Sequence, residues 1–444
     1  MKKIILILVL FTLHTAATAQ KKKEQSTTTK NEKWNSDLFK GLAFRSIGPA
    51  LTSGRIADFA VNPNNHKEYF VASASGGVWK TSNAGITYDP VFDNEGSYSI
   101  GCVRIDPNNT NVIWVGSGEN NNQRSVAYGD GVYKSIDGGK SWKNMGLKNS
   151  EHTGMIAIDP KNSDIVYVAA YGPVWSAGGD RGIYKTTDGG KTWKQILFVS
   201  ENTGFNEIHI DPRNSNILYA TSHQRRRQLY GYVNGGPESF LFKSVDAGTT
   251  WDTLKTGLPD GDKGRIGLAI SPVNPDYIYA IIEAGPKKGG VFRSVNRGAT
   301  FEKMCDNTTS GNYYQELFCD PKDVNKVFYM DFWINVSLDG GKTFKKIGEK
   351  YKHVDNHALW IDPDDTQHIL SGCDGGIYET WDNGSNWQFK SNLPVTQFYK
   401  VALDNDSPFY NVYGGTQDNH SLGGPSRTTS ANGISNADWF FTQE

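Results

Sequence analysis

The amino-acid sequence predicts an all-β fold, a seven-bladed β-propeller built from four-stranded antiparallel blades. Two short sequence markers carry this prediction, because they recur seven times and in step with each other, at intervals of roughly 50 residues. A third observation is that the segments between the markers alternate like short strands, while no stretch has the periodicity of an amphipathic helix.

The first marker is best preserved in "YKTTDGGKTW", residues 184–193. Asp188 can accept hydrogen bonds from backbone N–H groups of its own turn, and two glycines, Gly189 and Gly190, supply the positive φ angles of a tight hairpin. Trp193 presents a large apolar face that can wedge between adjacent blades. The copies end on an aromatic residue at Tyr88, Trp142, Trp193, Trp251, Phe301, Phe344 and Trp387.

The second marker is a short Pro-containing turn, such as "IDPKN" around Pro160, and it separates the first two strands of each unit. Its prolines are Pro63, Pro107, Pro160, Pro212, Pro272, Pro321 and Pro363. In the third unit, the pattern predicts strands over 154–160, 165–171, 182–187 and 192–198. Each unit therefore has the four antiparallel strands of one propeller blade.

The pattern S/T-x-D-x-G-x-x-W resembles the Asp-box (BNR) repeat of sialidases, sortilin-type receptors and xyloglucanase-type glycoside hydrolases. The resemblance covers about residues 44–394, and the box is degenerate at Asn83 and Asn296. In those families the box is a fold element set away from the catalytic centre. The residues to which it assigns this structural role are Asp137, Asp188, Asp246, Asp339, Asp382, Trp142, Trp193, Trp251 and Trp387.

A four-stranded meander places its connections at two ends. The first-to-second-strand turns and the Asp-box turns share one end, which we name the constant face. The second-to-third-strand loops and the links between blades share the other, the variable face. Blades 2, 3 and 4 have long loops there (118–131, 171–182 and 223–239), and such insertions often mark a binding face. The predicted binding residues in these loops are Arg124, Tyr128, Trp175, Asp180, Arg181, Arg225, Arg226, Arg227, Tyr230 and Tyr232. Aromatic rings beside charges suit a glycan or a protein hot spot.

Three carboxylates, Glu119, Glu283 and Asp374, follow the second strands of their blades. Glycoside hydrolysis needs two carboxyl groups roughly 5–9.5 Å apart, and Glu119 and Asp374 are the catalytic candidates. The resemblance to xyloglucanase-type hydrolases implies two tandem seven-bladed propellers, each supplying one catalytic aspartate. The position that matches the first aspartate is Ala74 here, so enzyme activity is left open.

Two hypotheses therefore remain: a glycan-active propeller, either hydrolase-like or lectin-like, and a sortilin-like receptor or scaffold that binds protein. A sialidase is disfavoured, because it would need an arginine triad and a tyrosine nucleophile on a six-bladed ring.

Two further segments lie near the end of the repeat. "HVDNH" offers His353, Asp355 and His357 as candidate metal ligands, although hydrogen bonds that close the ring are the favoured role, and we expect no cofactor. "GGTQDN" places Gln417 and Asp418 beyond the seventh blade as further binding candidates. The propeller is predicted over 41–394. Residues 395–444 are predicted to be an incomplete extra blade, the start of a second propeller, a closing segment or part of a larger ring.

The N-terminus has the pattern of a secretory signal: Met1-Lys2-Lys3, an apolar run over 4–13, and small residues up to a cleavage site near Ala19. A signal peptide is predicted over 1–19 and a flexible leader over 20–40, so we expect a secreted or periplasmic protein. With 46 basic and 47 acidic residues, the net charge of −1 gives no reason to expect nucleic acid. No later segment is apolar enough to span a membrane. The expected partner is a polysaccharide or glycan, or an exported protein.

Overall fold

The computed structural model describes residues 36–120 and 126–443. The chain divides into two compact units, 1–46 and 47–444. In the first, the described residues include a short 3₁₀ turn, η1 (Ser36–Phe39). The predicted signal peptide, and the leader up to residue 35, lie outside the described residues. The second unit is all β, and its described part contains eight antiparallel sheets and no α-helix. No helix in the described ranges is long and apolar enough to cross a membrane.

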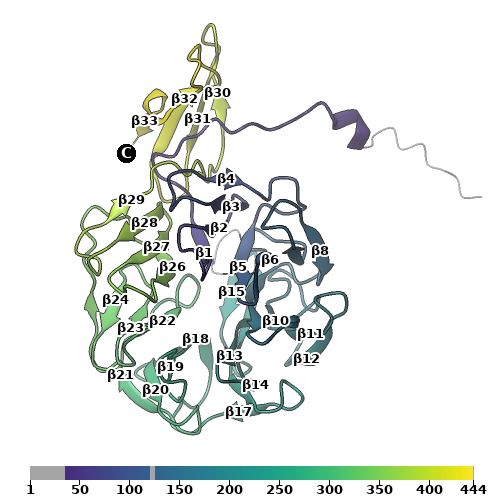
Figure 1. Ribbon diagram of the computed structural model, residues 1–444, viewed down its shortest axis with the longest axis vertical. Helices are drawn as coiled ribbons and strands as arrows, with labels where there is room; N and C mark the ends of the chain where they lie inside the picture. The colour runs from purple at the N-terminus through teal and green to yellow at the C-terminus, as the bar shows by residue number, and fades with distance from the viewer. Residues whose placement is uncertain (1–35, 121–125, 444) are drawn as a thin grey trace, which may run out of the picture. The chain divides into compact units, whose positions relative to one another are not determined.

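The sheets follow one another in chain order within the second unit (Figure 1). The first contains β1 (Ile56–Val61), β2 (Tyr69–Ser73), β3 (Val78–Thr81) and β4 (Asp89–Pro90). The second contains β5 (Ile100–Asp106), β6 (Asn109–Ser117), β7 (Val132–Ser135) and β8 (Lys143–Gly146). The third contains β9 (Thr153–Asp159), β10 (Asn162–Ala170), β11 (Gly182–Thr186) and β12 (Lys194–Leu197). The fourth contains β13 (Thr203–Asp211), β14 (Asn214–Gln228), β16 (Leu241–Ser244) and β17 (Asp252–Leu254), and β15 (Gly231–Asn234) pairs with β14.

The remaining sheets continue the pattern. The fifth contains β18 (Lys263–Ile270), β19 (Ile278–Ala284), β20 (Gly290–Ser294) and β21 (Glu302–Cys305). The sixth contains β22 (Leu317–Cys319), β23 (Val327–Tyr329), β24 (Asn335–Ser337) and β25 (Lys345–Lys346). The seventh contains β26 (Asn356–Ile361), β27 (Ile369–Cys373), β28 (Gly376–Thr380) and β29 (Gln388–Phe389). The eighth contains β30 (Ala402–Leu403), β31 (Asn411–Gly415), β32 (Ser421–Pro425) and β33 (Phe440–Gln443), with the 3₁₀ turn η2 (Asn436–Asp438) before its last strand. The predicted four-stranded antiparallel sheets are confirmed.

Three of the four Asp-box tryptophans, Trp142, Trp193 and Trp387, bond their sheet to the preceding one. The Trp193 indole N–H donates to the carbonyl of Met145 in the second sheet (2.8 Å), and its ring lies edge-on to Trp114. Trp142 donates in the same way to Val91 O, 2.7 Å, and Trp387 to Gly348 O, 2.5 Å. In these three, the apolar ring fills the junction between two sheets while its one polar atom is satisfied across it. Trp251 differs, because its buried Nε1 has no hydrogen-bond partner among the described residues.

The box turn has the geometry that its residues predict. One Asp188 carboxylate oxygen accepts from the Thr192 backbone N–H (2.9 Å), and the other accepts from the Thr192 hydroxyl (2.6 Å). The second box glycine is the demanding position, because Gly190 has φ 93° and a Cβ there would lie 2.6 Å from Trp114 of the preceding sheet. The first glycine position tolerates side chains, since Ala84, Ala247, Arg297 and Asn383 occupy it with φ of 55–58°.

The first and seventh sheets share one apolar core, which includes Ile56 and Tyr69 from the first sheet and Leu370 and Ile377 from the seventh. The Asn392 side-chain amide also donates to two carbonyls of the first box turn, those of residues 85 (3.1 Å) and 86 (2.7 Å). These contacts join the seventh sheet to the first, as a closed ring of the first seven sheets requires.

The eighth sheet, in the segment that the sequence suggested was incomplete, has four strands of its own. Leu422 is fully buried, and Trp439 covers Gly424 and donates its indole N–H to Ile47 O, 3.0 Å. The segment lacks an Asp box but has four paired strands rather than a partial blade, and Trp439, which lies between η2 and β33, packs over Gly424.

Candidate functional site

The two predicted catalytic carboxylates meet at one arginine on the variable face. Arg55, directly before β1, donates from Nε and Nη2 to the two carboxylate oxygens of Asp374 (2.6 and 2.7 Å). Its Nη1 donates to Glu119 Oε1 (2.8 Å), and all three residues are buried. Sequence reasoning identified the acids and missed the arginine, which stands alone without a motif.

Asp374 is held ionised. Burial alone raises its pKa, but the Arg55 guanidinium and the His357 ring outweigh burial and hold the pKa of this carboxyl well below its usual range. His357 Nε2 lies 2.8 Å from Asp374 Oδ1, and its Nδ1 lies 3.1 Å from the Tyr313 carbonyl oxygen. A carboxylate in this state can stabilise positive charge, but it binds a proton weakly and cannot serve as a proton donor near neutral pH.

The "HVDNH" residues do not gather as metal ligands. Both ring nitrogens of His357, which lies in β26 rather than in the preceding loop, face protein partners. His353 Nδ1 lies 2.8 Å from the Val354 carbonyl oxygen, and Asp355 accepts the Tyr314 hydroxyl proton. The favoured alternative fits instead, because His357, Asp374 and Arg55 connect the seventh sheet to the first.

The "GGTQDN" loop of the eighth sheet lies beside Asp374. Asn419 donates its side-chain amide to the Asp374 carbonyl oxygen (3.0 Å), and the Gln417 backbone N–H donates to Gln397 O (2.9 Å). Burial, and then the neighbouring Asp374 carboxylate, raise the pKa of Asp418. The two predicted binding residues of this loop, Gln417 and Asp418, are thus placed next to the predicted catalytic acid.

Arg181, a predicted binding residue, is completely buried and shapes its own loop. Its guanidinium donates only to backbone carbonyl oxygens, those of Tyr171 (2.8 Å), Pro173, Ser176 (2.9 Å) and Gly178 (2.9 Å). The prediction that Arg181 binds a ligand is corrected, because its buried guanidinium is bonded to the carbonyl oxygens of its own loop. Arg181 stabilises the loop that carries Trp175.

The consecutive arginines of blade 4 have different surroundings. Arg225 is buried, lies over the Tyr171 ring (5.5 Å to its centroid) and donates to the Asn120 carbonyl oxygen (2.7 Å). Arg226 donates to the Asn202 side chain, 2.5 Å. Successive side chains of a strand point to opposite faces of the sheet, so Arg225 and Arg226 of β14 have different neighbours.

Arg227 is part of an exposed arrangement that we name the aromatic platform: Trp175, Arg227 and Tyr232. The predicted blade 4 loop is a β-hairpin, in which β14 continues to Gln228 and pairs with β15 so that Arg227 lies opposite Tyr232. The guanidinium carbon lies 5.6 Å from the Tyr232 ring centroid and 5.8 Å from that of Trp175. Both rings are 48% exposed, and Tyr230 at the hairpin tip is 89% exposed.

The other predicted binding residues surround these groups. Tyr128 is exposed on the blade 2 loop. Asp180 accepts the Asn149 backbone N–H through a carboxylate oxygen, 2.9 Å. Arg124 lies outside the described residues.

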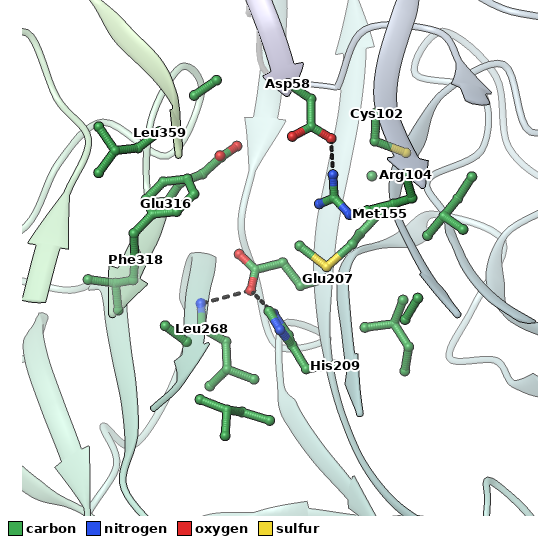
Figure 2. A pocket seen from close by; sticks show the side chains of 18 of the residues that line it. Asp58, Cys102, Arg104, Met155, Glu207, His209, Leu268, Glu316, Phe318 and Leu359 are labelled. Carbon is green, nitrogen blue, oxygen red and sulfur yellow. Dashed lines mark hydrogen bonds and ion pairs between the residues drawn. The ribbon is translucent and has the colours of Figure 1, made fainter. Parts of the chain in front are cut away.

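A cavity of about 650 Å³ is lined by first strands from all seven leading sheets (Figure 2). Asp58 and Arg104 form an ion pair in it, and Glu207 accepts from the Leu268 backbone N–H (2.8 Å) and lies 2.9 Å from His209 Nε2. Because Asp58 also accepts a backbone N–H from the second sheet (3.0 Å), these acids bond neighbouring sheets together.

Glu316 differs from the other acids of the cavity. Figure 2 shows its carboxyl group turned towards the same space as those of Asp58 and Glu207. Burial raises the pKa of Glu316 to about 7, although Arg265 Nη2 lies 3.1 Å from its Oε1. Sequence reasoning missed the cavity, because its polar residues are spread one or two to a blade along otherwise apolar strands.

Comparison with known proteins places this architecture beside polysaccharide-degrading enzymes. No family model matches the chain. It is 24% identical to the xyloglucanase Xgh74A of Acetivibrio thermocellus over 87% of this chain and 57% of the relative. It is 22% identical to a probable oligoxyloglucan-reducing end-specific xyloglucanase of Neosartorya fischeri, over 71% of this chain and 41% of the relative. The chain therefore spans only part of the length of the curated relatives it matches.

Among solved structures, the GH74 xyloglucanase from Xanthomonas campestris superimposes with a TM-score of 0.63 at 15% identity, covering 84% of this chain and 59% of the enzyme. YCF48 bound to D1 peptide superimposes with a TM-score of 0.50 at 16% identity, covering 77% of this chain and 98% of that protein. The protein is thus an all-β propeller of blade-like antiparallel sheets. The resemblance to xyloglucanase-type propellers, which the Asp boxes suggested, is confirmed, and the resemblance to sortilins stays a prediction.

Proposed function

We propose that this protein is an exported, glycan-active propeller that binds a polysaccharide through its variable face. The aromatic platform is the observation that carries the proposal. Two half-exposed rings are held in place by the arginine between them, so little side-chain entropy is lost when a sugar ring packs on them. The xyloglucanases among the relatives support a polysaccharide as the ligand class, and the N-terminal sequence pattern supports export.

Hydrolysis is the second part of the proposal, with Glu119 and Asp374 as the catalytic candidates. The ionised Asp374 suits the carboxylate partner of a glycosidase, and Asp418, whose pKa is raised, is the neighbouring group that can hold a proton. Against this, Arg55 engages both candidates, and the position of the first catalytic aspartate is the buried Ala74. Binding is therefore proposed ahead of catalysis.

Binding and hydrolysis are tested separately on the full chain. Calorimetric titration with xyloglucan oligosaccharides should give saturable binding, which Trp175→Ala or Tyr232→Ala weakens at least tenfold. Trp381→Ala is the matched control, because Trp381 is equally exposed (53%) but sits in an Asp-box turn of the constant face. If all three variants bind like the parent protein, the platform is not the site. Reducing-sugar release that disappears in Asp374→Asn and Glu119→Gln would establish hydrolysis, and its absence from the parent protein would leave a binding protein.

A protein-binding propeller is the second candidate. YCF48, whose structure holds a D1 peptide, is matched over almost its whole length, and the hairpin tip exposes Leu229 and Tyr230 almost completely. An exposed aromatic tip beside arginines has the composition of a protein hot spot. This function predicts that Tyr230→Ala releases a co-purifying exported protein while glycan arrays stay blank.

A further inference from the structure

We propose a site for a divalent transition-metal ion of the Zn²⁺ class on the constant face, where the first and seventh sheets meet. Its ligands are His66, Asp362 and Asp364. One ligand atom from each of the three lies within 4.8 Å of the other two. The imidazole comes from the turn between β1 and β2, and both carboxylates come from the turn between β26 and β27, about 300 residues later in the chain.

Corresponding turns elsewhere show that these ligands are exceptional. Each turn is counted from the residue before its marker proline, so Asp362 and Asp159 are first positions. At the junction of the third and fourth sheets, Asp159 accepts the hydroxyl of Ser215, the fifth residue of the next turn, at 2.8 Å. At the junction of the seventh and first sheets, that fifth residue is His66, and its Nδ1 lies 3.3 Å from Asp362 Oδ1.

The third position changes as well. It is Lys161 in the third sheet and Asp364 in the seventh. Among the seven turns, only one has a histidine at the fifth position, and only one has an acid at the third position. These two turns, in the first and seventh sheets, lie next to each other. The fifth positions are His66, Thr110, Ser163, Ser215, Pro275, Val324 and Thr366, and the third positions are Asn64, Asn108, Lys161, Arg213, Val273, Lys322 and Asp364.

Two of the three ligands are already oriented. Asp362 Oδ1 accepts the Asp364 backbone N–H (2.8 Å), and its Oδ2 lies 2.9 Å from His368 Nδ1, whose Nε2 lies 2.8 Å from Glu379 Oε1. The His66 ring packs edge-on to Trp360, with 5.3 Å between centroids. Hydrogen-bonded partners of this kind fix the direction of metal-binding carboxylates and imidazoles.

The spacing and the donor atoms fit zinc. The 3.3 Å between His66 Nδ1 and Asp362 Oδ1 is longer than a typical N–H···O bond of about 2.9 Å. It equals the edge of a tetrahedron whose metal–ligand distances are about 2.0–2.1 Å. One imidazole nitrogen with two carboxylates suits Zn²⁺ or a similar ion better than Ca²⁺, which prefers oxygen ligands alone. Asp364 is exposed and can swing into place, and water can supply the fourth ligand.

The test uses the full chain without a histidine tag, stripped with a chelator. Calorimetric titration with Zn²⁺ should give one equivalent of binding and a rise in Tm, and Co²⁺ should give the strong visible absorption of tetrahedral coordination. Asp364→Asn and His66→Ala should each weaken Zn²⁺ binding at least tenfold. Asp365→Asn is the matched control, since it removes the same charge one residue further along and should bind like the parent protein.

The proposal fails if Zn²⁺ does not bind with a defined stoichiometry. It fails equally if Asp364→Asn and Asp365→Asn weaken binding alike, because that result indicates attraction by the general charge of the turn. His66→Ala with unchanged affinity would also overturn it. Xyloglucan titrations of the same variants report on the variable face, and they should be unchanged.

Discussion

The Asp-box turns of the constant face and the Arg55 cluster of the variable face satisfy their charged groups in opposite ways. On the constant face, Asp137 accepts hydrogen bonds only from residues within four positions of it in the sequence. On the variable face, Arg55 bonds to Glu119 and Asp374, which are 64 and 319 positions away. Hydrogen bonds between residues close in sequence can be copied with each repeat, so the residues that make them appear as a motif. Ion pairs between distant sheets, such as those of Arg55, are made once in the molecule. The residues that form them therefore have no repeated signature in the sequence.

Removing the arginine at the centre of the variable face should have the largest effect. Arg55→Met leaves two buried carboxylates without their counter-charge, and breaking a buried pair in this way costs about 3–5 kcal/mol. Urea unfolding measures the loss. Arg55→Lys keeps the charge without the two-pronged contact and should lose less. Equal stability of Arg55→Met and the parent protein would show that the network does not hold the ring together.

On the constant face, the two box glycines should differ. Gly139→Ala forces a residue with φ 87° to place a Cβ 2.9 Å from Phe70 Cε1. A Cβ at Gly138, φ 72°, meets the flexible end of Lys80 at 3.5 Å and Asn111 Oδ1 at 3.8 Å, both ordinary contacts. Overpacking of this kind costs about 1–3 kcal/mol beyond the backbone strain that both variants share. Thermal unfolding of the pair gives the difference directly, and equal losses would mean that the box glycine serves only the backbone.

Acid should weaken the constant face. The Thr250 hydroxyl and backbone N–H lower the pKa of Asp246 to about 2, and the equivalent bonds from Thr343 lower that of Asp339 to about 2, against about 3.9 in an unfolded chain. The folded pKa is the lower one, so the contribution to stability is complete above about pH 4 and is lost as the pH falls towards 2. In Asp246→Asn, Tm should fall below that of the parent at pH 7 and converge with it near pH 2. A difference in Tm that stays constant with pH would contradict this assignment.

The smallest effect on stability should come from the aromatic platform. Trp175→Ala removes a half-exposed ring, so the free energy of unfolding should change by less than about 0.5 kcal/mol. The affinity for the glycan should nevertheless fall at least tenfold. Differential scanning calorimetry beside the binding titration separates the two. A large loss of stability would make Trp175 a packing residue of its loop rather than a binding residue.

Sequence reasoning succeeded where interactions are local and repeated. The box turns, the tryptophan wedges and the four strands of each sheet all follow from a period and from the chemistry of turns. It also placed Glu119 and Asp374 at equivalent strand ends, and Arg55 joins the two. It could not find Arg55, whose partner Asp374 is set by closure of the ring, or Glu316, whose partner Arg265 lies on the neighbouring sheet. It took Arg181 for a surface group, because nothing in the sequence distinguishes an arginine that binds a ligand from one that donates to its own loop.

The direction of the tryptophan contacts has a consequence for synthesis of the chain. Trp142, Trp193 and Trp387 each donate to a carbonyl that lies 39 to 51 positions earlier. During translation the acceptor of each bond therefore leaves the ribosome before its donor, and a sheet can dock on its predecessor as soon as it is made. The junction between the seventh sheet and the first must wait, with the first sheet's edge uncovered until the chain has been synthesised as far as the seventh sheet, which ends at Phe389.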